Sequence, residues 1–424
     1  MKAYRGGKEI TDIKELKAHI ASAARLENVG VFLGSGCSLS AGGKMVKAIW
    51  ESFKSDYTDS YAYFLANYFI TPEEDADAAK VNIEYKFDSI ETALIEWKRG
   101  KRVQAEIDSL KEHQHNLYRA VLNGVKLSED FWKSPDAPMY DSKLIDHRRL
   151  LIKLVGNRQP GQGAPWLFTT NYDLAIEWAA ESLGLLVLNG FSGLHNRTFA
   201  AHNFDLGFRN NLGRGEARFG VYNCYLVKLH GSLTWLSEGA QRVREIPADY
   251  AKLRIDEFLK STKPLESPGL MIYPSAAKYV HTTGYVYAEL IRKFSEFLSR
   301  NQTCIMVSGY SFGDEHLNRV LLSALQNPTL HMIVYLPELE AALATPTTAG
   351  HEFVRRLHEL ALPQVTLVGS DKDAYFDKLV EDIPAPALLD DRTEQARKLM
   401  RLFEEVAHSG VVPAVPPPSA AGAV

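Results

Sequence analysis

The stretch "VFLGSGCSLS", residues 31–40, is typical of a buried strand that runs into a ligand-binding turn. Its apolar residues lead into Gly34, Ser35 and Gly36, and Ser38 follows. Glycines at this point let the backbone come close to a phosphate, and the amides that open the next helix favour an anion. The usual dinucleotide fingerprint needs a third glycine where Leu39 stands, so a tight structural turn remains the alternative.

The flanking sequence predicts an α/β protein. Residues 12–27 have the periodicity of an amphipathic helix, and a second helix is expected over about 41–55. Further strand signals follow residue 165 and are separated by helical stretches: "PWLFTT", "GLLVLNG", "VYNCYLVKLHG", "GLMIYPS", "TCIMVSGYSF", "HMIVYLP" and "QVTLVGS". Apolar strands that alternate with helices indicate a Rossmann-like, mostly parallel sheet that is covered on both faces.

Changes in amino-acid composition along the chain suggest a domain organisation. Residues 1–56 and 150–375 would form the Rossmann-like domain, with residues 191–220 as a long loop or small subdomain. Residues 57–149 show helical periodicity and few β-branched runs, so we expect a mostly helical insertion in which Trp97 and Tyr118 are packing residues. A C-terminal helical extension over 376–407 and a disordered, proline-rich tail over 408–424 would complete the chain.

Charge, hydropathy and cysteine content exclude several classes of protein. A net charge of −4 gives no general attraction to nucleic acid or anionic lipid. Apolar runs are only as long as strands, and the first residues contain no signal-peptide core. Cys37, Cys224 and Cys304 are far apart and form no metal-binding pair, so we expect buried free thiols. These features favour a cytoplasmic protein without a structural zinc site.

Four predicted strands end in polar tips. The glycine turn is the first of them. The other three are "WLFTTNYD" with Thr170, Asn171 and Asp173, "YLVKLHGS" with His230, and "IMVSGYSFGD" with Gly309, Ser311 and Asp314. The carboxyl ends of parallel strands lie along one edge of a sheet, and ligands bind in the crevice outside that edge. We therefore expect these residues to meet at one site, although helix capping alone also places Ser, Asn and Asp at such positions.

Each tip offers a possible chemical role. Asn171 can donate and accept hydrogen bonds without a charge, which suits a ribose hydroxyl or an attacking water. His230 can act as a general base near neutral pH, or it can be a buried histidine that bonds to backbone. Asp173 and Asp314 can cap the helices that follow them, and Ser311 could reach a ribose or phosphate.

Together these residues resemble the SIR2-like family, over residues 29–318. "GSGCSLSAG" looks like that family's first NAD-binding loop, and "SGYSFGDEHLN" looks like its later ribose-contacting loop. "TTNYDLAIE" and "KLHGSLTW" look like its catalytic segments, which implies Asn171 and His230 as catalytic residues. The resemblance implies that the loop residues and Thr170, Asp173, Gly309, Ser311 and Asp314 bind NAD. Four zinc-binding cysteines of the deacylase branch are missing, so no zinc ribbon is expected.

"TTNYD" with "GYSFGDEH" resembles the SIR2-like proteins of bacterial antiphage defence, in which this domain hydrolyses NAD. The resemblance implies an NAD+ glycohydrolase that forms nicotinamide and ADP-ribose, without a metal, as the toxic effector of abortive infection. The stretch after residue 375 is too short for a sensing domain, so activation through a partner or homo-oligomerisation is expected. A HerA-type DNA-translocating ATPase is the expected partner and a short Argonaute the second choice. Neither membrane nor direct nucleic-acid binding is expected.

Three other functions remain possible on the sequence. A zinc-less NAD-dependent protein deacylase would use the same nucleotide site. A module that binds NAD or ADP-ribose without turnover would signal to a partner. A DNA-binding accessory would use a local basic patch of Arg209, Arg214 and Arg218, although these side chains can equally belong to a solvated loop.

Overall fold

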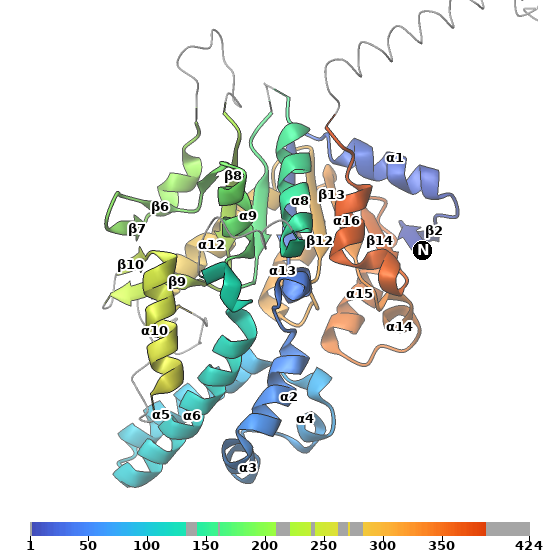
Figure 1. Cartoon of the computed structure of the whole chain (residues 1–424). Helices are drawn as coiled ribbons and strands as arrows, with labels where there is room; N and C mark the ends of the chain where they lie inside the picture. Colours follow the sequence, from blue (N-terminus) through green and yellow to red (C-terminus); the bar gives the residue numbers. More distant parts are fainter. Residues whose placement is uncertain are drawn as a thin grey trace, which may run out of the picture. The chain divides into compact units, whose positions relative to one another are not determined.

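A computed structural model of the chain describes residues 2–132, 142–159, 162–208, 221–238, 242–261, 270–271 and 283–386. Its centre is a nine-stranded sheet with the order β2-β1-β14-β13-β12-β3-β4-β8-β5 (Figure 1). The strands are β1 (Lys2–Arg5), β2 (Lys8–Glu9), β3 (Asn28–Leu33), β4 (Trp166–Thr169), β5 (Leu186–Leu188), β8 (Asn223–Lys228), β12 (Thr303–Ser308), β13 (Leu330–Tyr335) and β14 (Val365–Gly369).

Seven of these strands, from β14 across to β5, run parallel, and β1 and β2 extend the β14 edge as an antiparallel hairpin. The predicted α/β fold with a mostly parallel sheet is therefore confirmed. The hairpin was not predicted, because strands of four and two residues carry almost no periodic signal.

Helices cover both faces of this sheet, which explains why its strands are apolar on both sides. Val31 and Leu33 of β3 face one core, while Phe32 between them faces the other. The first core contains α1 (Ile13–Ala23), α8 (Ile145–Gly156), α9 (Ala175–Ser182) and α16 (Phe376–Asp382). The second contains α12 (Thr283–Leu298), α13 (Glu315–Ala324), α14 (Leu339–Ala344) and α15 (Ala349–Glu359).

The chain reverses its direction of travel across the sheet between β3 and β12. From β3 it continues through β4 to β8 and β5 on one side, and β12, β13 and β14 later fill the other side. Such a reversal leaves a crevice outside the carboxyl ends of the two central strands, where α/β proteins bind ligands. The glycine turn after β3 and Gly309 after β12 lie at this point.

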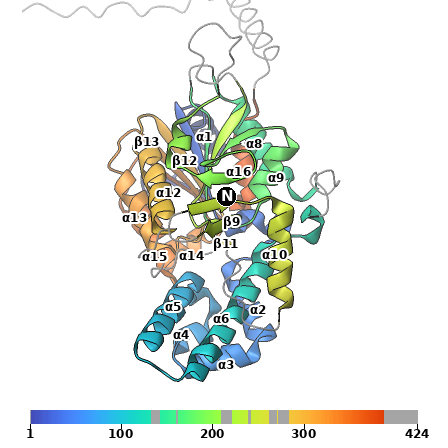
Figure 2. The same ribbon diagram turned by 90° about the vertical axis from the view of Figure 1, so that its left-hand side faces the viewer.

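A separate helical region follows the glycine turn. Its elements are α2 (Val46–Asp56), α3 (Thr58–Ala66), α4 (Pro72–Ala76), η2 (Ala78–Lys80), α5 (Ile83–Arg99) and α6 (Gln104–Val125), with η3 (Glu129–Trp132) after them. They build a third core, to which α10 (Ala248–Lys260), Tyr172 and Leu233 also contribute. Figure 2 shows α2, α3, α4, α5 and α6 together at one end of the sheet. Tyr118 is buried against Phe87 in this core, as predicted for a packing residue.

The glycine turn itself folds differently from the predicted helix over 41–55. A short 3-10 helix, η1 (Ser35–Ala41), follows β3 and ends at Gly42, whose φ of +91° is left-handed. Gly42 and Gly43 then separate η1 from α2, which begins only at Val46. Glycine tolerates the left-handed conformation that ends a helix, so the pair explains the break.

A second sheet accounts for part of the region predicted as a loop or subdomain over 191–220. It has five strands in the order β11-β9-β10-β7-β6: β6 (Phe191–Ser192), β7 (Arg197–Phe199), β9 (Ser232–Glu238), β10 (Arg242–Glu245) and β11 (Leu270–Met271). The 3-10 helix η4 (Ala201–Asp205) follows β7. Strand β9 was not predicted separately, because its sequence directly continues the β8 signal.

Several sequence predictions concern residues outside this description. Arg209, Arg214 and Arg218 lie there, as do the proposed tail and residues 387–407 of the proposed C-terminal extension. The described α16 packs on α8, and a compact unit ends at Pro384, so the start of that extension belongs with the sheet's helices. Across the described residues, we find no helix long and apolar enough to cross a membrane.

Candidate functional site

The four polar-tipped strands lie next to one another in the sheet, in the order β12-β3-β4-β8. These strands end at the same level of the sheet, because Leu33 pairs with both Ser308 and Thr169, and Thr169 pairs with Lys228. Residues that follow these strand ends therefore share one edge, although long stretches of chain separate them. This edge brings together the glycine turn, Asn171, His230 and Gly309.

The turns after β3 and β12 touch through their backbones. The amide of Gly36 donates to the carbonyl of Gly309 at 3.0 Å, and the amide of Gly34 donates to that of Ser308 at 3.0 Å. A Cβ on Gly34 would lie 2.3 Å from the Gly309 oxygen, and Gly309 itself has a φ of +65°. Close packing of the two turns thus requires these glycines, and the predicted approach of a phosphate to this turn stays a prediction.

Asn171 is held by the glycine turn after β3. Its side-chain amide Nδ2 donates to the carbonyl of Gly34 and to Oγ of Ser38, each at 3.0 Å. An asparagine amide group has two hydrogens, so both are used, and the side-chain oxygen Oδ1 is the atom that Asn171 can offer to a ligand. As an acceptor, this oxygen can orient a water or a ribose hydroxyl.

Ser38 and Asp173 support this arrangement from inside the protein. The Ser38 hydroxyl, which is buried, donates to Oδ2 of Asp173 at 2.7 Å. The other carboxylate oxygen of Asp173 accepts from the amide of Ala175, which opens α9. Lys228 at the end of β8 bonds to the Asp173 carbonyl and, at 2.7 Å, to Glu177. Ser38 and Asp173, which were predicted to bind NAD, position the Asn171 loop through these hydrogen bonds.

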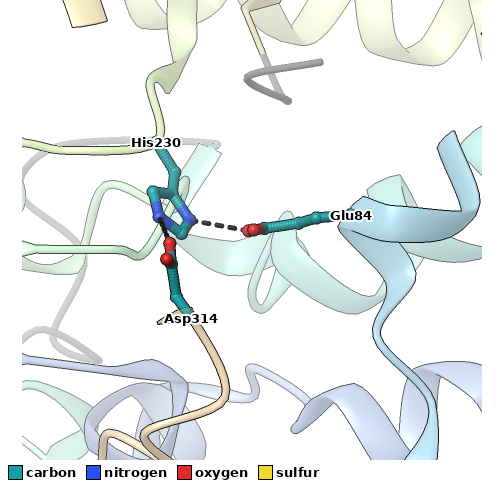
Figure 3. A group of neighbouring side chains, drawn as sticks. All are labelled: Glu84, His230 and Asp314. Atoms are coloured by element: carbon teal, nitrogen blue, oxygen red, sulfur yellow. Dashed lines mark hydrogen bonds and ion pairs between the residues drawn. The ribbon is translucent and has the colours of Figure 1, made fainter. Parts of the chain in front are cut away.

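His230 is bonded to a carboxylate at each ring nitrogen (Figure 3). Its Nε2 lies 3.0 Å from Oδ2 of Asp314, and its Nδ1 lies 2.7 Å from Oε1 of Glu84. Asp314 also caps α13, because its Oδ1 accepts from the amides of His316 and Leu317. The predicted capping role of Asp314 is thus confirmed, and its second oxygen orients the histidine.

The two carboxylates determine the charge of the histidine. Burial alone would lower the pKa of His230, but the charges and hydrogen bonds of Glu84 and Asp314 outweigh it and raise this pKa to about 10. Burial would likewise raise the pKa of Asp314, yet the bond to His230 and the capping amides bring it below its usual value. At neutral pH, His230 is therefore an imidazolium between two carboxylates.

Glu84, His230 and Asp314 are also close enough to suggest a metal site, with potential donor atoms within 4.8 Å of one another. The two carboxylates, however, approach opposite nitrogens of one ring (Figure 3). One ion can bind only one of these nitrogens. The arrangement fits two hydrogen-bonded ion pairs better than a site in which all three side chains hold one ion.

The remaining predicted residues lie at different depths around this edge. Ser35 and Thr170 are half-buried, and the Thr170 amide donates to the Leu33 carbonyl. Ser311 is exposed, and no described hydrogen bond joins it to Asn171 or His230. Cys37 is buried, as are Cys224 and Cys304, and all three are free thiols as predicted. Burial raises the pKa of the Cys37 thiol, whose sulfur donates to the Ser308 carbonyl.

Sequence patterns missed Glu84, Tyr172 and Lys228. Glu84 lies in the first turn of α5, where a glutamate is usually explained by the helix dipole, and the hydroxyl of Tyr172 donates to it at 3.3 Å. Lys228 is a buried charged residue at the end of β8, an exception that could have marked it as a residue with a specific partner. For Glu84 no local signal exists, because its partner is far away in the sequence.

Comparison with protein families identifies the domain. Residues 165–346 match the family model of the SIR2-like domain. This segment contains Asn171, His230 and Asp314, but it begins after the glycine turn and after Glu84. The chain thus contains a SIR2-like domain, which indicates an enzyme that uses NAD. No curated protein matches the sequence.

Proposed function

We propose that this chain is an NAD+ glycohydrolase, which cleaves NAD+ with water to nicotinamide and ADP-ribose. The main support is the meeting of Asn171 and His230 at the carboxyl edge of β4 and β8, within the segment that matches the SIR2-like domain. NAD would lie across the crevice between β3 and β12, with its pyrophosphate near residues 34–38 and its nicotinamide ribose toward Asn171. An extended ligand with hydroxyl groups fits neutral acceptors such as Asn171 Oδ1 at that edge.

In this reaction the bond between C1′ of the ribose and the nicotinamide nitrogen breaks. Its electron pair goes to the nicotinamide ring, which leaves as a neutral molecule and needs no acid. A water molecule, oriented by Oδ1 of Asn171, forms the new bond to C1′ through an oxocarbenium-like state. The water's proton goes to His230, which can accept it only when one ring nitrogen is free of a proton.

The biological role we propose is depletion of NAD+ as the effector of a bacterial antiphage, abortive-infection system. Motifs such as "TTNYD" and "GYSFGDEH" support this, since they resemble those of SIR2-like defence proteins. An unregulated enzyme of this kind would be toxic to its host, so a trigger must act through a partner or through self-assembly. A HerA-type ATPase is the partner we propose first, and a short Argonaute is the second.

The test is NAD+ turnover by the purified chain, alone and with the co-expressed partner, with nicotinamide and ADP-ribose as products. We expect Asn171→Ala and His230→Ala to reduce turnover of the activated assembly by about 100-fold or more. Asn301→Ala and His202→Ala, at exposed positions away from the edge, serve as matched controls and should retain activity. Full turnover by both site variants, or no NAD+ consumption by any assembly, would contradict the proposed function.

A further inference from the structure

We propose that Glu84 holds His230 in its protonated form and so withholds the base of the proposed reaction until the helical region moves. This inference rests on the proposed NAD+ hydrolysis and names the residue that restrains it. Glu84 lies outside the segment that matches the SIR2-like domain, in helix α5.

The argument begins with hydrogen-bond donors and acceptors. A neutral imidazole has one N–H group and one lone pair, whereas a carboxylate at neutral pH only accepts. Glu84 faces Nδ1 at 2.7 Å and Asp314 faces Nε2 at 3.0 Å, so both nitrogens must carry a proton to satisfy both contacts. The ring then has no lone pair left, and it cannot take a proton from water.

Other groups around the ring do not change this charge. The hydroxyl of Tyr287 on α12 donates to the backbone carbonyl of His230, and that of Tyr172 donates to Glu84. Tyr310 after β12 donates to the Asp314 carbonyl at 3.4 Å, and burial raises its pKa well above the usual value. Phenols are neutral near pH 7, so among the described groups named here the two carboxylates provide the opposing charge.

The two carboxylates belong to different parts of the chain. Asp314 is fixed to the sheet edge by its capping bonds on α13, as described above. Glu84 opens α5, whose Phe87 and Ile90 pack in the third core, which the helical region forms together with Tyr172 and Leu233. If α5 shifts and Glu84 withdraws, Asp314 still holds Nε2–H and Nδ1 becomes free. A histidine oriented by one carboxylate, with its other nitrogen free, is the arrangement of a general base.

The charge of the ring can be measured directly by NMR on the full chain labelled at histidine ring atoms, with His230→Asn to assign the signal. We expect His230 to remain a cation at pH 7.5 in the unmodified chain. Glu84→Gln keeps the size of the side chain but removes its charge, and should lower the pKa of His230 by about one pH unit or more. Glu96→Gln, an exposed glutamate on the same helix, is the matched control and should leave the titration unchanged. A neutral ring in the unmodified chain, or no effect of Glu84→Gln, would overturn the inference.

NAD+ hydrolysis by the chain without a partner gives the second measurement. Glu84→Gln and Glu84→Ala should raise this basal turnover about tenfold or more at pH 7.5, while Glu96→Gln should not. Loss of turnover in both Glu84 variants of the activated assembly, with unchanged melting temperatures, would mean that the reaction needs Glu84, which overturns the inference. If no variant hydrolyses NAD+ but the ring titration shifts, the proposed function fails and the control of His230 charge by Glu84 stands.

Discussion

Nδ1 of His230 and Oε1 of Glu84 lie 2.7 Å apart, which joins a histidine of the sheet edge to the first turn of a helix in a separate core. Through this contact, the position of α5 controls whether the Glu84 carboxylate lies beside His230 in the proposed reaction centre. It also explains why a histidine with the position of a catalytic base carries a proton at neutral pH. A movement of α5 would therefore change the contact between Glu84 and His230.

Asp314→Asn tests the orientation of His230. Asparagine can still cap α13, so the melting temperature should stay within a few degrees, whereas the negative charge beside Nε2 is lost. We expect turnover of the activated assembly to fall about 100-fold or more, with little change in KM, because the histidine loses the partner that selects its protonated nitrogen. The check is a pair of kcat and KM values, with the exposed Glu315→Gln as a control. Unchanged kcat would show that Asp314 does not orient the base.

The pH dependence of stability follows from the raised pKa of His230. In the unfolded chain this group has its ordinary pKa near 6.5, and in the folded chain its pKa is about 10. The stabilisation is therefore complete below pH 6.5 and is lost as the pH rises through 10. We expect the melting temperature of the unmodified chain to exceed that of His230→Asn by a margin that shrinks between pH 7 and pH 10. Glu84→Gln should weaken this trend, and a margin that does not change with pH would contradict the assignment.

Gly34→Ala tests the contact between the turns after β3 and β12. The added Cβ would meet the Gly309 oxygen at 2.3 Å and Cα of Tyr310 at 2.6 Å, so one backbone must move. We expect a loss of about 1–3 kcal/mol in unfolding free energy and weaker NAD+ binding. Gly163→Ala is the matched control, since a Cβ there meets nothing within 4 Å. Denaturant unfolding and calorimetric NAD+ titration give both quantities, and equal effects of the two variants would refute this reading.

Lys228→Met tests the buried support beneath Asn171. Lys228 is buried and bonds to Glu177 and to the carbonyl of Asp173, so its loss leaves both groups without their cation. We expect destabilisation by about 3 kcal/mol. Because burial raises the pKa of Glu177, the loss should be smaller at acid pH, where this carboxyl group is neutral. Combining it with Glu177→Gln should recover part of the stability in a double-mutant cycle. If the stability losses of the two single variants simply add up in the double variant, Lys228 and Glu177 are not coupled.

Sequence patterns predicted the β3, β4, β8 and β12 strands and the polar residues at their ends, because both depend on local features. Apolar runs without a polar face mark strands that are buried on both sides, and Val31, Phe32 and Leu33 face two cores as that pattern requires. The helix start at Val46 was misplaced, because a Gly42–Gly43 pair inside a helical pattern does not show by itself that the helix stops there.

By itself, the sequence determined the α/β class, the polar strand ends and the free cysteines, since periodicity and residue type act over short distances. Only the tertiary structure decided that β12, β3, β4 and β8 are neighbours, and that the glycines of two turns pack against each other. It also decided that Glu84 rather than solvent meets Nδ1 of His230. Such contacts depend on how whole helices pack into separate cores, and no local pattern records which side chain a distant element will bring to a strand end.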